Sequence, residues 1–179
     1  MNYIKIYKFY IFSIIFTLIL GTILHFAFQW SNSNLFVASF SAVNESTWEH
    51  LKLVYYPMII TIIIGYFYLE NDGKRYLCSK TIGIISAMIF IIIFFYTYTG
   101  IIGTNYSFFN IAIFVLAVIF GEYVTYLIMK SKYICNLKIS ILILLAFLFC
   151  FILFTYFPPK LNLFKDPITN SYGISKASN

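Results

Sequence analysis

Five long apolar stretches, separated by short polar segments, run through this chain of 179 residues. A helix needs roughly 20 apolar residues to cross the hydrocarbon core of a bilayer, and each stretch has about this length. In lipid, a single segment satisfies its own backbone polar groups only as a helix. The sequence therefore predicts an all-α, polytopic membrane protein that forms one integral membrane domain over residues 1–179. Its five transmembrane helices are expected at about residues 9–29, 51–69, 82–102, 108–129 and 139–157.

The composition agrees with lipid as the main solvent. Hydrophobic residues make up 61% of the chain and charged residues only 10%, whereas a soluble domain carries about 25% charged residues. A net charge of +6 would suggest a nucleic-acid partner in a soluble protein. Here the lysines between membrane helices account for the charge, so the expected partner is the lipid bilayer and no nucleic acid.

Basic residues also predict the orientation, because cytoplasmic loops are enriched in lysine and arginine. With the N-terminus inside, eight basic residues fall in inner segments and four in outer ones. We therefore expect the N-terminus inside and the C-terminus outside. The abundance of Ile, Lys, Asn, Phe and Tyr fits AT-rich coding, which points to a bacterial plasma membrane. The inner residues are Lys5, Lys8, Lys74, Arg75, Lys80, Lys130, Lys132 and Lys138; the outer ones are Lys52, Lys160, Lys165 and Lys176.

Two polar segments are expected outside: the loop 31–50 and the C-terminal tail 158–179, which begins where Pro158 and Pro159 stop the fifth helix. The apolar part of residues 31–43 is too short to span, so it lies on the interface or re-enters the membrane. The three cysteines, Cys78, Cys135 and Cys150, show no paired metal spacing, and none falls outside. No disulfide is therefore expected.

The segment AVNESTWEHLKL, residues 42–53, concentrates ionisable groups at the start of the second apolar stretch. Ser46 and Glu49 have capping-box spacing, in which each side chain bonds the backbone amide of the other residue. Trp48 is expected as an interfacial anchor, and Lys52 either pairs with Glu49 or extends toward lipid headgroups. A helix start thus accounts for part of the segment.

The remaining polar residues suggest a pocket that opens outward. His25 and Gln29 lie near the outer end of the first helix, and an ionisable group in a membrane span usually faces the interior or a water-filled cavity. The alternative for His25 is a structural hydrogen bond to a neighbouring helix. The tail, with Lys165 and Asp166, could cover the pocket. The candidate pocket residues are His25, Gln29, Asn44, Glu45, Glu49, His50 and Asp166.

Metal binding is chemically open but not predicted, and no cofactor is identified. Two histidines with two or three carboxylates suffice for zinc. However, neighbouring Glu49 and His50 point about 100° apart on a helix, and neither H-E-x-x-H nor H-x-x-E-H occurs. A carboxylate and a histidine can perform general acid–base catalysis, but no nucleophile motif accompanies them.

Glu122 stands apart in the fourth predicted helix, roughly 12 Å from its inner end. A carboxylate in a membrane span often belongs to a proton or ion path, so Glu122 is a candidate inner relay. The alternatives are pairing with a basic inner loop, or hydrogen bonds to Tyr or Thr neighbours. Ala117 and Gly121 before it have the spacing of a helix-packing motif.

The strings GTILHFAFQWS, SAVNESTWEHLKLVYYPM and FPPKLNLFKDPITNSYGI extend over nearly the whole chain. In these the sequence resembles an uncharacterised family of multi-pass membrane proteins, found mainly in clostridia and carrying a VNESxWEHLK motif. The resemblance implies an all-helical membrane protein and no particular activity. Three functions remain open: binding or translocating a small solute or ion, catalysis on a lipid or envelope substrate, or a non-catalytic accessory role.

Overall fold

The computed structural model describes residues 3–174. Helices are the regular secondary structure of this part, which also contains one isolated bridge between Lys165 and Tyr172. Five of its helices are long and apolar enough to cross a membrane, as predicted. These are α1 (Tyr3–Trp30), α3 (Thr47–Tyr68), α4 (Gly73–Ile102), α5 (Ser107–Lys130) and α6 (Leu137–Tyr156). The short elements are α2 (Leu35–Ala38) and the 3-10 turns η1 (Glu70–Asp72) and η2 (Asn162–Phe164).

The helix bounds extend beyond the apolar stretches. α4 begins at Gly73 rather than near residue 82, and α1 begins at Tyr3 rather than near residue 9. A helix continues past the apolar core wherever polar residues can be solvated or paired, so hydropathy locates the spans better than their ends. The segment 31–43, expected on the interface or re-entrant, contains the single helical turn α2.

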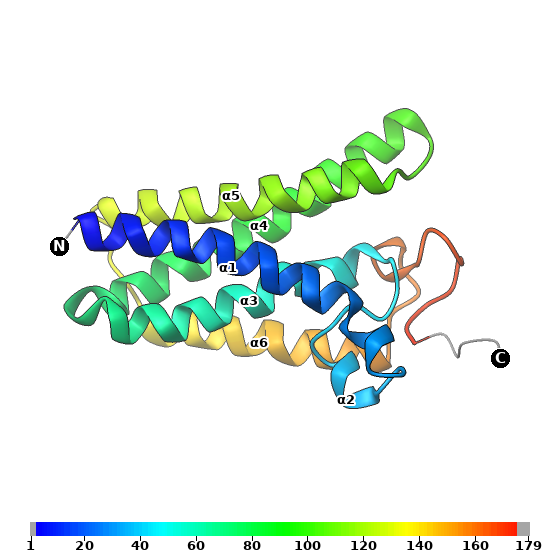
Figure 1. Ribbon diagram of the computed structural model, residues 1–179, viewed down its shortest axis with the longest axis horizontal. Coiled ribbons are helices and arrows are strands. Elements are labelled where there is room, and N and C mark those ends of the chain that lie inside the picture. Colours follow the sequence, from blue (N-terminus) through cyan, green and yellow to red (C-terminus); the bar gives the residue numbers. More distant parts are fainter. Residues whose placement is uncertain (1–2, 175–179) are drawn as a thin grey trace.

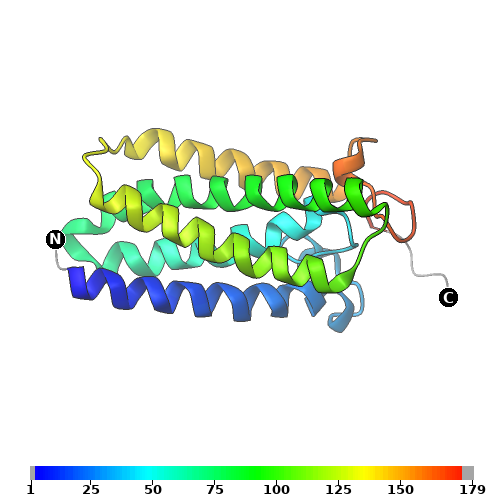
Figure 2. The ribbon, with the colours of Figure 1, turned by 90° about the horizontal axis from the view of Figure 1, so that it is seen from above.

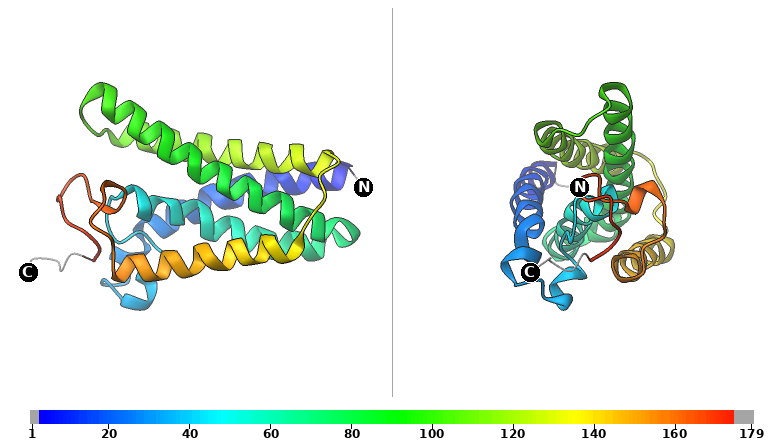
Figure 3. Two further views of the ribbon diagram at one scale, coloured as in Figure 1. Left: turned by 180° about the vertical axis from the view of Figure 1, so that it is seen from behind. Right: turned by 90° about the vertical axis from the view of Figure 1, so that its right-hand side faces the viewer.

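The long helices form one bundle with two distinct ends (Figure 1). The N-terminus, η1 and the α5–α6 connection lie at one end, and α2, the α4–α5 turn and the tail lie at the other. α4 packs against α3, α5 and α6, and α1 packs against α3 and α5. α1 and α6 lie on opposite edges (Figure 2), and the view along the bundle shows α3 and α4 between them (Figure 3).

A proline and a glycine bring α1 and α3 together. Pro57 lies inside α3 and has no backbone N–H, so the Leu53 carbonyl one turn earlier receives no helical hydrogen bond from it. Gly21 of α1 lies against that carbonyl. A Cβ at Gly21 would lie 2.6 Å from the Leu53 oxygen and 2.7 Å from Phe114 Cζ. Only glycine therefore permits this close approach.

A second glycine contact joins α4 and α5. A Cβ at Gly121 would lie 2.7 Å from the Gly83 carbonyl oxygen, and a Cβ at Gly83 would collide with the Gly121 carbonyl. Ala117, one turn before Gly121, is fully buried. The packing role predicted for Ala117 and Gly121 is thus observed, and it lets the two backbones touch beside Lys80 and Glu122.

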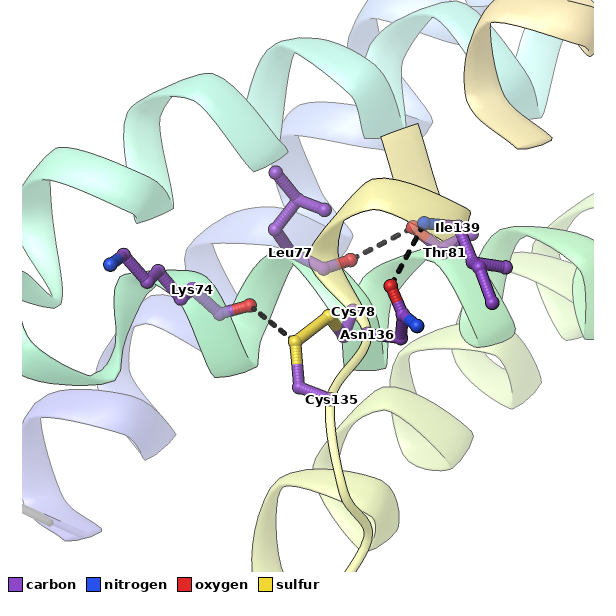
Figure 4. Close-up of a disulfide and its surroundings, with 7 residues drawn as sticks. All are labelled: Lys74, Leu77, Cys78, Thr81, Cys135, Asn136 and Ile139. Carbon is purple, nitrogen blue, oxygen red and sulfur yellow. Dashed lines mark hydrogen bonds between the residues drawn. A yellow bond between two sulfur atoms is a disulfide. The ribbon is translucent and has the colours of Figure 1, made fainter. Parts of the chain in front are cut away.

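The expectation of no disulfide is wrong. Cys78 of α4 and Cys135 of the α5–α6 connection are bonded, with their Cα atoms 5.7 Å apart (Figure 4). Asn136, next to the bond, caps α6 by accepting the Ile139 amide at 3.2 Å. The two cysteines are 57 residues apart in sequence. They meet because the α5–α6 connection packs against α4, and no spacing in the sequence predicts this contact.

Candidate functional site

The start of α3 contains half of the predicted capping box. Ser46 Oγ accepts the Glu49 amide at 3.4 Å, as expected. The Glu49 carboxylate does not return to the Ser46 amide and instead accepts the Val43 amide at 3.0 Å. Asn44 Oδ1 takes its place and accepts the Ser46 amide at 2.9 Å. The carboxylate is thereby directed away from the helix axis into the bundle.

Glu49 forms a buried ion pair with Lys52. Their Oε2 and Nζ atoms are 2.5 Å apart, and neither side chain is more than 3% exposed. Lys52 Nζ also donates to the Ala38 carbonyl and to Thr155 Oγ1, both at 2.9 Å. The pair therefore connects α2, α3 and α6. Glu49 belongs to this structural network rather than to a water-filled pocket.

Trp48 is not the interfacial anchor that the sequence suggested. Only 8% of the residue is exposed, and its ring packs against Phe151, Phe154 and Phe164 at centroid distances of 4.7 to 5.6 Å. Aromatic packing of this kind contributes beyond simple area burial. Through these contacts the tryptophan packs α3 against α6 and against η2 near the start of the tail.

Three other predicted pocket residues do converge. His25 of α1 and His50 of α3 lie on either side of Glu45, which precedes α3. The Nε2 atoms of His25 and His50 lie 3.8 Å and 3.4 Å from the Glu45 carboxylate oxygens. The imidazole rings are 5.3 Å apart. All three side chains are partly exposed, at 22 to 35%, so a solute or ion can reach them.

Gln29, Asn44 and Asp166 lie outside this cluster. Gln29 is exposed on α1. The Asn44 amide donates to the Gly173 carbonyl at 2.8 Å. Asp166 is buried and accepts the Ile168 amide at 2.7 Å within the tail. Asn44 thus binds the tail to the loop before α3, whereas Asp166 stabilises a turn within the tail. Residues 175–179 of the predicted tail lie outside the described part.

A cavity of about 590 Å³ adjoins the cluster. It lies where the tips of α4 and α5 splay away from the tail (Figure 1). Its lining contains one acidic side chain, one basic side chain and several amides and hydroxyls, among them Glu45, Thr47, Asn105, Asn110, Asn162 and Lys165. A volume of this size suits a small molecule.

Hydrogen bonds organise the wall formed by the α4–α5 turn. Tyr98 donates to Asn110 Oδ1 at 2.5 Å and lies 2.8 Å from Asn105 Oδ1. The Asn110 amide donates to the same Asn105 oxygen at 2.8 Å. Sequence reasoning missed Asn105 and Asn110 as site residues. In the sequence they are two asparagines in and just after a short turn, and asparagine is common at turns.

Glu122 lies far along the bundle in a second polar group. Its Oε1 atom forms a buried ion pair with Lys80 of α4 and accepts the Ser13 hydroxyl at 2.5 Å. Lys80 Nζ also donates to Ser13 Oγ at 2.8 Å. Glu122 Oε2 is buried without a hydrogen-bond partner among residues 3–174. The alternative predicted for Glu122, pairing with a basic residue of an inner loop, is thus observed, although Lys80 lies within α4 and not in a loop.

The fold defines the class of protein: it is all-helical, and five of its helices are long and apolar enough to span a membrane. The chain belongs to the family of unknown function DUF6512, which it matches over residues 1–174. No curated protein and no solved structure matches it. The predicted membership of an uncharacterised family is therefore confirmed, and the family match indicates no activity.

Proposed function

We propose that this protein binds a small zwitterionic solute at the outer face of a bacterial plasma membrane, in the cavity between the α4–α5 tips and the tail. In this proposal the N-terminus is inside and the C-terminus is outside. The cavity then opens to the exterior, with the His25–Glu45–His50 cluster beside it. Glu122, paired with Lys80, takes no part in solute binding.

The charge distribution supports this orientation. The end of the bundle with the N-terminus carries exposed or half-buried basic residues on α1, on α4 and in the α5–α6 connection. The opposite end carries Lys160 and Lys165, while Lys176 lies outside the described residues. An excess of lysine and arginine marks the cytoplasmic side. The sequence resemblance to clostridial membrane proteins supports a bacterial plasma membrane, and it suggests that the VNESTWEHLK string characterises the family.

The lining of the cavity carries the proposal. Among the described residues that line it, Glu45 supplies the only acidic group and Lys165 the only basic group. Asn105, Asn110 and Asn162 supply amides that both donate and accept. A solute that carries an ammonium and an anionic group matches this set. A hydrocarbon solute would offer no partner to the charged groups of Glu45 and Lys165.

A thermal-shift screen of the purified full-length protein in detergent tests this function. The probes are free amino acids, phosphocholine and phosphoethanolamine, each against a neutral polyol of similar size. A ligand that binds only the folded state raises the melting temperature as its concentration exceeds Kd. We expect at least one zwitterion to raise it in the wild type and not in the Lys165→Met variant.

Lys160→Met is the matched control, because Lys160 is an exposed lysine of the same tail that does not line the cavity. It should keep the wild-type response. The function is refuted if no zwitterion shifts the melting temperature, or if Lys165→Met and Lys160→Met respond as the wild type does.

A further inference from the structure

We propose that His25, Glu45 and His50 form a binding site for a divalent transition-metal ion of the zinc class. The three residues come from α1, from the loop before α3 and from α3 itself. Each offers one ligand atom, and these atoms all lie within 4.8 Å of one another. The site goes beyond solute binding in the cavity, although Glu45 borders both.

The spacing is close to that of a metal centre. Zinc–nitrogen and zinc–oxygen bonds of about 2.0–2.1 Å place tetrahedral ligand atoms about 3.3 Å apart. The Glu45 oxygens lie 3.4 Å from His50 Nε2 and 3.8 Å from His25 Nε2. Side-chain shifts of about 1.5 Å at most would close the site around an ion.

The hydrogen bond of His50 determines which nitrogen is available. His50 Nδ1 lies 2.9 Å from the Ser46 carbonyl oxygen. A carbonyl only accepts, so Nδ1 carries the proton and donates it. In a neutral ring the Nε2 lone pair then faces the Glu45 carboxylate. Two lone pairs at 3.4 Å repel each other, and either a proton on Nε2 or a metal ion between the two atoms relieves this repulsion. A backbone carbonyl is a usual outer partner of a metal-bound histidine.

Packing holds the His25 ring. It lies edge-on to Phe26 at 4.7 Å and beside His50 at 5.3 Å. Its Nδ1 atom is buried without a hydrogen-bond partner among residues 3–174, so Nε2, which faces Glu45, is the nitrogen that can bind a solvent-derived ion. Two imidazoles this close would repel each other if both were protonated, whereas a shared metal ion leaves both rings neutral.

The ligand types favour particular ions. Two imidazoles and a carboxylate suit zinc, cobalt and nickel, whereas magnesium and calcium prefer all-oxygen sites. Three protein ligands leave a fourth tetrahedral position for water or for a group of the solute. The site therefore has the composition of an open zinc centre rather than a closed structural one.

The chain suits a direct binding experiment, because His25 and His50 are its only histidines. The full-length protein is purified in detergent with a tag that contains no histidine, and is stripped with EDTA. Zinc is titrated by calorimetry, and cobalt is titrated by its visible absorption. We expect one ion per chain and the intense bands of tetrahedral cobalt. His50→Gln and Glu45→Gln should each weaken zinc binding by more than the about 10- to 100-fold that loss of an outer-shell partner costs.

Glu70→Gln is the control, because Glu70 is an exposed carboxylate at the opposite end of the bundle. It should bind zinc as the wild type does. Melting curves in EDTA confirm that each variant is folded, and Glu45→Asp, which keeps the carboxylate, should retain measurable binding. The metal site is overturned if the wild type binds no stoichiometric ion, or if His50→Gln and Glu45→Gln bind as tightly as Glu70→Gln.

The proposal of a metal site and the proposal of solute binding can be refuted independently of each other. Lys165→Met should abolish the zwitterion response and leave zinc binding intact, because Lys165 is not a ligand of the cluster. His50→Gln should weaken zinc binding strongly, and the zwitterion response of this variant then reports the cavity alone. Loss of zinc binding in the Lys165→Met variant would contradict a site formed by His25, Glu45 and His50.

Discussion

Lys80 of α4 and Glu122 of α5 form an ion pair in which neither side chain is more than 1% exposed. Removing one partner of such a pair leaves an uncompensated buried charge and costs about 3–5 kcal/mol. We therefore predict that Lys80→Met and Glu122→Gln each lower the melting temperature strongly. The Lys80→Met/Glu122→Gln double variant should recover much of the loss, because it removes both charges.

Thermal unfolding of the four proteins in one detergent measures this coupling as a double-mutant cycle. Additive losses in the double variant would show that the two residues act independently and would contradict the buried pair.

The Gly21–Leu53 contact predicts that alanine destabilises the protein at position 21 but not at position 100. Gly21→Ala places a methyl group 2.6 Å from the Leu53 carbonyl oxygen and should destabilise the protein by about 1–3 kcal/mol. Gly100→Ala is the matched control in α4, because a Cβ there meets nothing within 4 Å. It should be neutral or slightly stabilising, since alanine is the better helix former. Equal melting temperatures for the two variants would argue against the close approach of α1 and α3.

Thr155 tests the network around the Glu49–Lys52 pair. Thr155→Val keeps the shape of the side chain but removes the oxygen that accepts from Lys52 at 2.9 Å. A buried ammonium that loses one partner should destabilise the protein by about 1–3 kcal/mol. Thr22→Val removes a hydroxyl that bonds only within its own exposed helical turn and should change stability little. A loss of stability in Thr155→Val no larger than that in Thr22→Val would show that Thr155 does not stabilise the Glu49–Lys52 pair.

The disulfide predicts a specific sensitivity to reductant. In the proposed orientation it lies at the cytoplasmic end, where thiols are kept reduced, so the oxidised purified protein is the sample to use. Dithiothreitol should lower its stability by about 2–4 kcal/mol, and Cys135→Ser should match the reduced wild type with or without dithiothreitol. Cys150→Ser, which removes the free thiol, should behave as the wild type. A melting temperature that is insensitive to dithiothreitol would contradict a stabilising role.

The sequence predicts some of these features well because they depend on local patterns. Apolar stretches predict the spans, and Ser46 three residues before Glu49 predicts the start of α3. Lys80 was placed in an inner loop because it follows Lys74 and Arg75, whereas it lies within α4. Its partner, Glu122, lies on another helix, so only tertiary packing brings the two together.

The same distinction applies at the candidate site. His25, Glu45 and His50 stand out as ionisable groups next to apolar stretches, which is a local signal. Lys52, three residues after Glu49, is also a local signal, and their predicted pairing is observed. In contrast, the contact of Asn44 with Gly173 and the bond between Cys78 and Cys135 join distant segments. No local spacing in the sequence encodes these contacts.

The central claim is that the polar cavity opens outward, and cysteine accessibility in intact cells measures this most directly. In a background without the three native cysteines, Asn110→Cys places a thiol on the cavity wall and Lys132→Cys places one in the α5–α6 connection. A membrane-impermeant thiol reagent added outside should label Asn110→Cys rapidly and leave Lys132→Cys unlabelled until the cells are lysed. A bound zwitterion should slow the labelling of Asn110→Cys. Labelling of Lys132→Cys but not Asn110→Cys in intact cells would contradict the account.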